Sequence, residues 1–254
     1  MTDLSNKHAL VVGVANEHSI AWGVAKALHE AGAHVALTYL NEKARPYVEP
    51  LAESIDAPIF LPLDVRDEAQ TEALFHTIAE RWGVLDTLVH SIAFAPGEDL
   101  HGRVVDSSLE GMQIAVDISV HSLIRLVRHS EPLFKNGGSV MTMSFYGAEK
   151  VVEHYNLMGP VKAALEATTR QLAAELGQKN ITVNTLSPGP MLTRAASGIG
   201  DFDELLQHAI ERAPLRRLAT PDDVGAMAAF LASDRAHNIT GQLIYIDAGY
   251  NIIG

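Results

Sequence analysis

Short runs of aliphatic and β-branched residues alternate with longer helical patterns along the whole chain, and this order constrains the fold more than any other feature. We expect strands over residues 8–14, 34–40, 59–65, 87–93, 139–145, 182–187 and 242–247. We expect helices over residues 20–31, 41–54, 68–82, 109–134, 156–177, 202–212 and 222–231. Strands that alternate with helices form a parallel sheet, because each crossover helix returns the chain to the same end of the sheet. The order predicts a doubly wound α/β protein with a seven-stranded parallel sheet.

Nearly continuous apolar runs, such as residues 9–12 and 35–37, support this prediction, since strands buried on both faces have this composition. No linker, low-complexity segment or internal repeat interrupts the series. A chain of 254 residues can enclose one large core. We therefore expect a single domain over residues 1–254.

Charge and composition exclude several classes of function. The net charge of −12 argues against a nucleic-acid partner, which requires a basic surface. The absence of cysteine excludes disulfides, thiolate zinc sites and cysteine nucleophiles, and the 12 histidines show no metal-ligand spacing, so we expect no metal. The chain has neither a signal-peptide core nor an apolar run of membrane-spanning length, so we expect a cytoplasmic protein without a membrane partner.

Tyr155 and Lys162 are the candidate catalytic residues. Their separation of seven residues is close to two helical turns, which would place the phenol and the ammonium on one face. A cation near a phenol favours the phenolate and makes the hydroxyl a better proton donor or oxyanion partner. Tyrosine–lysine pairs at this spacing are common on protein surfaces, so the pair indicates a catalytic role only together with the other motifs of the chain.

The turn after the first predicted strand is a candidate site for a dinucleotide. Gly13 lets the backbone turn tightly beside a ligand, and Ser19 lies where a helix N-cap belongs. The N-terminus of the following helix, which includes Ile20, suits a pyrophosphate. The turn lacks the Gly-x-Gly-x-x-Gly pattern, but it follows the first strand, where doubly wound folds bind dinucleotides.

The residues after the second strand favour NADH over NADPH. Leu40 ends this strand and Glu42 comes two residues later, whereas Lys43 and Arg45 come later still, on the expected helix. Glu42 would repel the 2′-phosphate of NADPH, and no cation stands directly after the strand to bind it.

The ends of the third and fourth strands could enclose the adenine and the rest of the cofactor. Asp64 could hydrogen-bond the adenine amino group, and Val65 could pack on the ring. The backbone around Ser91 and Ile92 could line the other side of the cofactor.

Four motifs in order carry a resemblance that covers almost the whole chain. They are Gly13-Val-Ala-Asn-x-x-Ser19-Ile-Ala-Trp-Gly23, His90-Ser-Ile-Ala-Phe-Ala-Pro96, Tyr155-x6-Lys162 and Ser187-Pro-Gly-Pro190-x-x-Thr193-x-Ala-Ala-Ser-Gly-Ile199. The chain resembles the enoyl-acyl-carrier-protein reductases, a divergent branch of the short-chain dehydrogenase/reductase superfamily. The resemblance implies a Rossmann-like homotetramer that uses a nicotinamide cofactor to reduce the trans-2 double bond of a fatty acyl thioester. The acyl group would be carried by acyl carrier protein, in fatty acid synthesis.

The resemblance also implies roles for individual residues. Hydride would reach the β-carbon, Tyr155 would stabilise the negative charge on the thioester oxygen, and Lys162 would bind the nicotinamide ribose. The turn with Met191, Leu192 and Thr193 would meet the carboxamide and phosphates, and Ala195 would also contact the cofactor. A lid over about residues 191–206 would cover the acyl chain. The acyl pocket would be lined by Phe94, Ala95, Leu100, Phe145, Tyr155 and Met158.

This sequence departs from the family at two places. Many members have a tyrosine at the position of Phe145, whereas here the tyrosine is the next residue, Tyr146, which would replace it only if the backbone turned there. Residues 200–204 are acidic where many members place basic residues for an acidic carrier protein. The cations that could compensate are Arg194, Arg216 and Arg217.

Three alternative functions remain open. The chain could be a paralogue specialised for coenzyme A thioesters, or a non-catalytic dinucleotide-binding module. It could also be a short-chain dehydrogenase that acts on a ketone or alcohol, for which the usual motif is Tyr-x-x-x-Lys. Tyr146-Gly-Ala-Glu-Lys150 has this spacing, but it follows its strand too closely to lie on the expected catalytic helix.

Overall fold

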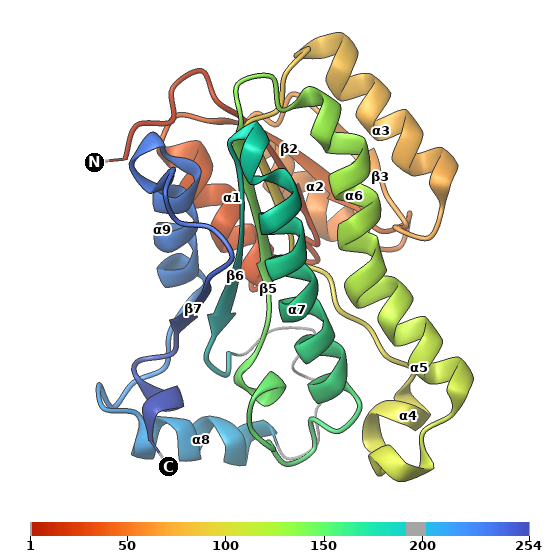
Figure 1. Cartoon of the computed structure of the whole chain (residues 1–254), viewed down its shortest axis with the longest axis vertical. Helices are drawn as coiled ribbons and strands as arrows, with labels where there is room; N and C mark the ends of the chain where they lie inside the picture. Colours follow the sequence, from red (N-terminus) through yellow and green to blue (C-terminus); the bar gives the residue numbers. More distant parts are fainter. Residues whose placement is uncertain (1, 192–201, 254) are drawn as a thin grey trace.

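The computed structural model describes residues 2–191 and 202–253 and contains one seven-stranded sheet (Figure 1). All strand pairs are parallel, in the order β3-β2-β1-β4-β5-β6-β7. The strands are β1 His8–Val12, β2 His34–Tyr39, β3 Phe60–Pro62, β4 Thr87–His90, β5 Gly138–Met143, β6 Ile181–Pro188 and β7 Leu243–Ile246. This topology confirms the predicted doubly wound, Rossmann-like α/β fold.

Helices cover both faces of the sheet (Figure 1). They are α1 Ile20–Glu30, α2 Arg45–Ser54, α3 Glu68–Arg81, α4 Gly97–His101, α5 Leu109–Val116, α6 Ser122–Ser130, α7 Met158–Leu176, α8 Phe202–Arg212 and α9 Pro221–Ala232. Leu10 and Val12 of β1 belong to the core that α3, α6 and α7 cover, whereas Ala9 and Val11 belong to the core under α1, α2 and α9. The apolar run in β1 therefore fills two cores, because successive side chains of a strand point to opposite faces.

Four strands end at least two residues earlier than the sequence pattern predicts. The pattern extends to residues 14, 65, 93 and 145, but β1, β3, β4 and β5 end at Val12, Pro62, His90 and Met143. The residues beyond these ends continue as loops at the carboxyl edge of the sheet. Apolar side chains in these loops, such as Leu63 and Val65, pack into the core without joining the ladder, so composition alone could not mark the strand ends.

The single helix predicted over residues 109–134 is wrong in its detail. The chain forms α5, a π-helical segment over Asp117–His121, α6 and a short 3-10 turn over Glu131–Leu133. The π-helical segment contains the buried residues Ile118, Ser119 and Val120, so its wider turn presents these side chains to the interior. The short helix α4 was not predicted, because its five residues are too few to show periodicity.

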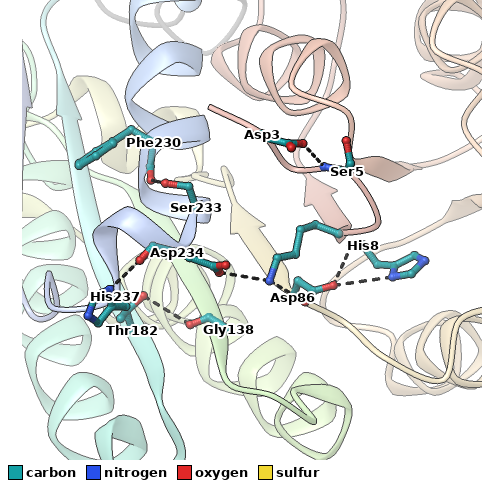
Figure 2. Close-up of polar contacts among 11 residues, drawn as sticks. Asp3, Ser5, His8, Asp86, Gly138, Thr182, Phe230, Ser233, Asp234 and His237 are labelled. Carbon is teal, nitrogen blue, oxygen red and sulfur yellow. Dashed lines mark hydrogen bonds and ion pairs between the residues drawn. The ribbon is translucent and has the colours of Figure 1, made fainter. Parts of the chain in front are cut away.

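Charged side chains tie the amino ends of the sheet together (Figure 2). The backbone N–H of His8 donates to Asp86, just before β4, at 2.9 Å. Lys7 lies 3.6 Å from the Asp86 carboxylate and 3.3 Å from that of Asp234, after α9. These contacts join β1, β4 and α9 at the end of the sheet that faces away from the carboxyl ends of the strands. In the described part of the chain, no helix is long and apolar enough to cross a membrane.

Candidate active site

The predicted functional residues gather at the carboxyl edge of the sheet, where β1 lies between β2 and β4. The chain passes from β1 to β2 on one side and later returns to β4 on the other. Doubly wound sheets bind ligands at such a switch point, because the two loops that leave adjacent strands separate there. In Figure 1 this edge faces the start of α7 and α8.

Gly13 has no room for a side chain. Its φ of +111° lies in the region that favours glycine, and a Cβ atom would lie 2.0 Å from the carbonyl oxygen of Ser91. The backbone N–H of Ser91 donates to Val12 at 2.9 Å, which continues the pairing of β1 and β4 to this point. The predicted tight turn at Gly13 is therefore present, and the backbone of Ser91 adjoins it as expected, followed by the half-buried Ile92.

Ser19 lies at the N-cap position of α1, as predicted, but its side chain does not cap the helix. Its hydroxyl instead donates to the carbonyl of Asn16 at 2.5 Å and accepts from the N–H of Ala15 at 3.3 Å. Ser19 thus shapes the loop, and no side-chain cap occupies the first N–H groups of α1 at Ile20. Uncapped N–H groups at a helix start attract an anion.

Tyr155 and Lys162 are both buried, with 7% and 5% of their surface exposed. The prediction that helical spacing aligns them is wrong in detail, because α7 begins at Met158 and Tyr155 lies in the preceding turn. In this turn Asn156 has a φ of +40°, and its side chain donates to the carbonyl of Leu100 at 2.9 Å. The turn is thereby attached to α4, and it holds Tyr155 ahead of the helix that carries Lys162.

Burial raises the pKa of the Tyr155 phenol, and the charge of Glu166 raises it further. Burial also lowers the pKa of Lys162, to about 8, although the charge of Glu166 acts in the opposite direction. The expected stabilisation of a phenolate by a nearby cation is therefore not found, because burial and Glu166 both raise the pKa of Tyr155. The phenol remains protonated and can donate a hydrogen bond to a ligand oxygen.

The ammonium of Lys162 is fixed by the carbonyl of Met143, at the end of β5, which accepts a hydrogen bond at 2.6 Å. The Tyr155 ring meets the ring of Phe145 edge-on, with 4.8 Å between centroids. A Cβ on Gly147 would lie 2.3 Å from the Tyr155 ring, so this glycine makes room for it. No residue in the described ranges hydrogen-bonds to the Tyr155 hydroxyl.

Phe145 and Tyr146 face different neighbours. The chain turns into a short 3-10 segment at Tyr146–Ala148, and the Tyr146 ring meets that of Tyr250 at 5.7 Å. Phe145, rather than Tyr146, therefore lies beside Tyr155. Lys150 is exposed after this turn, so the Tyr146-x-x-x-Lys150 string is not on α7, as the sequence suggested.

The end of β2 is followed by the carboxylate of Glu42, and Lys43, which was expected on the helix, is exposed in the loop before α2 begins at Arg45. Tyr39 donates to Glu42 at 3.1 Å, and Arg45 lies 3.7 Å from Glu42 and 2.7 Å from Glu49. Leu40, which directly follows the strand, is 55% exposed. The nearest arginine is thus already paired with acids, a charge arrangement that disfavours a 2′-phosphate.

Asp64 and Val65 lie beyond the end of β3. Both carboxylate oxygens of Asp64 accept hydrogen bonds from Arg66, the shorter at 2.7 Å, and this contact keeps the pKa of Asp64 below its usual value. An adenine amino group would have to share this carboxylate with Arg66. Val65 is buried, and its carbonyl accepts from Arg125 at 2.8 Å.

The expected acyl-pocket residues come from three segments. Phe94 is 49% exposed, Ala95 is buried, and Leu100 on α4 is partly buried. Met158 is buried at the start of α7. The hydroxyl of Ser119, from the π-helical segment, accepts from the N–H of Phe94 at 3.0 Å and donates to its carbonyl at 3.2 Å, which fixes the backbone at Phe94.

The expected lid is only partly within the described residues. Met191 is buried and belongs to the core under α1 and α9. Leu192, Thr193 and Ala195 lie outside the described residues, as does Arg194. Glu204, on α8, is exposed.

Three polar groups near Lys162 were missed by the sequence analysis. His90, at the end of β4, has one ring nitrogen 2.8 Å from Thr142 and the other 2.8 Å from Ser122. Burial and the charge of Lys162 lower the pKa of His90 to about 3, so its ring is neutral. Ser144 donates to Glu166 at 2.5 Å. A histidine at a strand end and a serine after the fifth strand were the available signals. Within the described ranges no group of three acidic or histidine side chains could hold a metal ion.

The sheet, the glycine turn at its switch point and the uncapped α1 place the chain among the Rossmann-like nucleotide-binding proteins. A family model described as enoyl-(acyl carrier protein) reductase matches residues 13–251. The chain is 50% identical to the enoyl-[acyl-carrier-protein] reductase [NADH] FabI of Synechocystis, over 100% of both chains. It therefore belongs to the enoyl-(acyl carrier protein) reductase family.

Solved structures of two similar proteins agree with this assignment. The enoyl-(acyl-carrier-protein) reductase of Anaplasma phagocytophilum, solved in complex with NAD, is 46% identical with a TM-score of 0.95, and the match covers 99% of this chain and 96% of that one. The Bacillus cereus enoyl-acyl carrier protein reductase, solved with NADP+ and indole naphthyridinone, is 43% identical with a TM-score of 0.97, over 100% of both chains.

Proposed function

We propose that this chain is an NADH-dependent enoyl-[acyl-carrier-protein] reductase, which reduces the trans-2 double bond of fatty enoyl thioesters in fatty acid biosynthesis. The buried pair of Tyr155 and Lys162 at the carboxyl edge of the sheet carries the proposal. A protonated phenol and an ammonium in a site shielded from water can stabilise a negative charge that develops on a thioester oxygen. The family assignment supports the same reaction class.

The residues at the switch point fit a dinucleotide. A Cβ at Gly13 would lie 2.0 Å from the carbonyl oxygen of Ser91, so the glycine is what lets the loops after β1 and β4 lie this close at the switch point. The first N–H groups of α1 have no side-chain cap and can receive the pyrophosphate. When bound there, the nicotinamide would supply the hydride for the β-carbon, and a proton from solvent at the α-carbon would complete the reduction.

The protein's own part in the reaction is to fix and stabilise charge. Tyr155 donates a hydrogen bond to the thioester oxygen as that oxygen becomes negative, since its raised pKa keeps the proton on the phenol. Met143 holds Lys162 by one hydrogen bond, and an ammonium has three N–H donors, so others can reach the nicotinamide ribose. The rings of Phe145 and Phe94 exclude water around the reacting carbons.

The preference for NADH follows from the paired state of Arg45. Glu42 and Glu49 already hold its guanidinium, so a 2′-phosphate would meet two carboxylates at the end of β2. The Bacillus cereus relative was solved with NADP+, so this preference must come from the local residues of each chain rather than from the fold.

We further propose that the whole chain acts as one cytoplasmic domain in a homotetramer, with residues 191–206 as a lid over the acyl chain. The acyl thioester would be presented by acyl carrier protein, an acidic partner. Arg216 and Arg217 are exposed after α8 and could receive it, whereas Glu204 would oppose it. A molecular mass, measured by light scattering or after cross-linking, that differs from four copies of the chain would contradict the tetramer.

The test follows NADH and NADPH oxidation with the same trans-2-enoyl group on acyl carrier protein and on coenzyme A. A β-ketoacyl thioester is included as the substrate of an ordinary short-chain dehydrogenase. We expect faster turnover with NADH and with the carrier-bound enoyl substrate. Turnover only on coenzyme A would favour the specialised paralogue, and turnover only on the β-ketoacyl thioester would favour the ketone reductase. Cofactor binding without turnover on any of them would favour a non-catalytic module.

A further inference from the structure

Glu166 is a buried carboxylate to which the proposed reaction assigns no role. It lies on α7, four residues after Lys162, and only 7% of its surface is exposed. Side chains four residues apart on a helix lie on the same face, with about 5–6 Å between their Cβ atoms. Glu166 therefore lies one helical turn further along α7 than the lysine, on the same face of the helix. A buried carboxylate needs partners, because an unpaired one is costly in the protein interior.

The end of β5 holds both members of this pair. Met143 accepts the hydrogen bond from the Lys162 ammonium at 2.6 Å, and the next residue, Ser144, donates its hydroxyl to Glu166 at 2.5 Å. One strand end thus fixes the cation through a carbonyl and the anion through a hydroxyl. Met143 and Ser144 are adjacent in the chain, and Lys162 and Glu166 are one helical turn apart. These two short separations leave the distance between the two charges little freedom to change.

The charge of Glu166 acts on both candidate catalytic groups in the direction that the reaction requires. It raises the pKa of Lys162, which burial alone would lower further, and it raises the pKa of Tyr155. The first effect favours the ammonium and the second favours the protonated phenol. His90, on β4, is neutral and adds no competing cation near Lys162.

The surroundings of Glu166 contain charges of both signs. Burial and the carboxylate of Glu149 raise the pKa of Glu166, whereas the hydrogen bond from Ser144 and the charges of Arg170 and Lys162 lower it. Burial raises the pKa of Tyr245, on β7, and the nearby acids Glu149 and Glu166 raise it further. Of the two acids, Glu149 is exposed and Glu166 is buried, so Glu166 is the one with a fixed position.

We propose that Glu166 is a positioning residue for Lys162 and Tyr155, set one helical turn after the lysine and held there by Ser144. The proposal rests on the proposed function, because it assigns those two residues to the reaction. Glu166 acts through them and does not touch the substrate.

The test compares the pH dependence of kcat/KM for the enoyl thioester in wild type, Glu166→Gln and Glu175→Gln. Glu175 is an exposed acid on the same helix, so its substitution removes the same charge without touching the site. In Glu166→Gln the alkaline limb should move to lower pH by about one unit or more, the size of effect that a nearby opposite charge has on a buried group. Glu175→Gln should retain the wild-type profile. Glu166→Asp, which keeps the charge, should restore the limb toward wild type.

Two further measurements keep the proposal falsifiable. Ser144→Ala keeps the carboxylate but loses the hydrogen bond that lowers its pKa, so the acid limb should move to higher pH. If Glu166→Gln does not fold, the pH profile of Ser144→Ala decides whether the proposal holds. The dissociation constant of NADH, measured by fluorescence over the same pH range, should show the same shift in Glu166→Gln.

The outcomes separate the two proposals. A uniform loss of activity in Glu166→Gln, with unmoved limbs and an unmoved NADH profile, would mean a purely structural residue and would overturn the role of Glu166. If wild type does not reduce the enoyl thioester at all, the proposed function fails. In that case the NADH profile alone decides whether Glu166 controls Lys162, since cofactor binding does not require turnover.

Discussion

Removal of the Tyr155 hydroxyl should abolish most of the catalysis and leave the fold intact. Tyr155→Phe deletes one oxygen from a ring that is 7% exposed and packs 4.8 Å from Phe145. In the described ranges no side chain hydrogen-bonds to this hydroxyl, so the substitution leaves no buried partner unsatisfied. The free energy of unfolding should therefore change by less than about 1 kcal/mol.

The catalytic loss can be estimated from the role of the hydroxyl. Loss of one donor to a developing oxyanion costs about 10²–10³-fold in kcat, or about 2.7–4 kcal/mol. The donor is neutral and buried, and its proton is retained because burial and Glu166 raise the pKa of Tyr155. A change of pH within the working range should therefore not restore activity in the variant. The dissociation constant for NADH should stay close to wild type, since Lys162 remains in place.

The assay measures kcat with the carrier-bound trans-2-enoyl thioester at saturating NADH, together with NADH affinity and thermal unfolding. Tyr146→Phe is the matched control, because it removes the hydroxyl of the neighbouring tyrosine, whose ring meets Tyr250 instead. The control should retain nearly full activity. The reasoning is refuted if Tyr155→Phe keeps kcat within about threefold of wild type, or if Tyr146→Phe shows the larger loss.

Three other perturbations test the remaining parts of the site. Gly13→Ala would place a Cβ 2.0 Å from a backbone oxygen, so the free energy of unfolding in urea should fall by about 1–3 kcal/mol and NADH should bind more weakly. A Cβ at Gly177 would meet no atom within 4 Å, so the control Gly177→Ala should leave both properties unchanged. Burial lowers the pKa of Lys162 from 10.5 to about 8, so between these pH values the unfolded chain binds more protons than the folded chain. As the pH rises through this range, the free energy of unfolding of wild type should therefore rise by about 3 kcal/mol relative to that of Lys162→Met. A difference in unfolding free energy that stays constant with pH would contradict this. Glu42→Gln removes one of the acids that hold Arg45, so kcat/KM for NADPH relative to NADH should rise about two- to fivefold, and an unchanged ratio would show that Glu42 does not set the preference.

The parallel sheet was predictable because it depends on a pattern that repeats along the whole chain. The alternation of strands and helices predicts the parallel sheet, and all seven expected strands are present. The division of residues 109–134 was not predictable, because the apolar pattern continues through it without a break. A π-helical turn adds a residue to one turn only, and packing of Ser119 against the segment after β4 stabilises it there.

The same difference between local and distant contacts explains which site residues the sequence indicates. Gly13, Tyr155 and Lys162 stand in motifs whose spacing is local, so each was found. Glu166 and Ser144 are 22 residues apart and carry no motif of their own. Only the alignment of the end of β5 with α7 brings them together, and that alignment is a property of the folded sheet.

Burial affects the two members of a tyrosine–lysine pair in opposite ways, and this difference determines what else such a site requires. Desolvation keeps a phenol protonated, which suits a hydrogen-bond donor, but it also removes the proton from an ammonium. In this protein both groups are almost completely enclosed, and burial is the largest influence on each. A pair alone at this depth would be driven toward two neutral groups. A fixed anion corrects the lysine without disturbing the phenol, because a negative charge raises both pKa values. Glu166 supplies such a charge, so the motif and its buried carboxylate are best understood as a site of three groups.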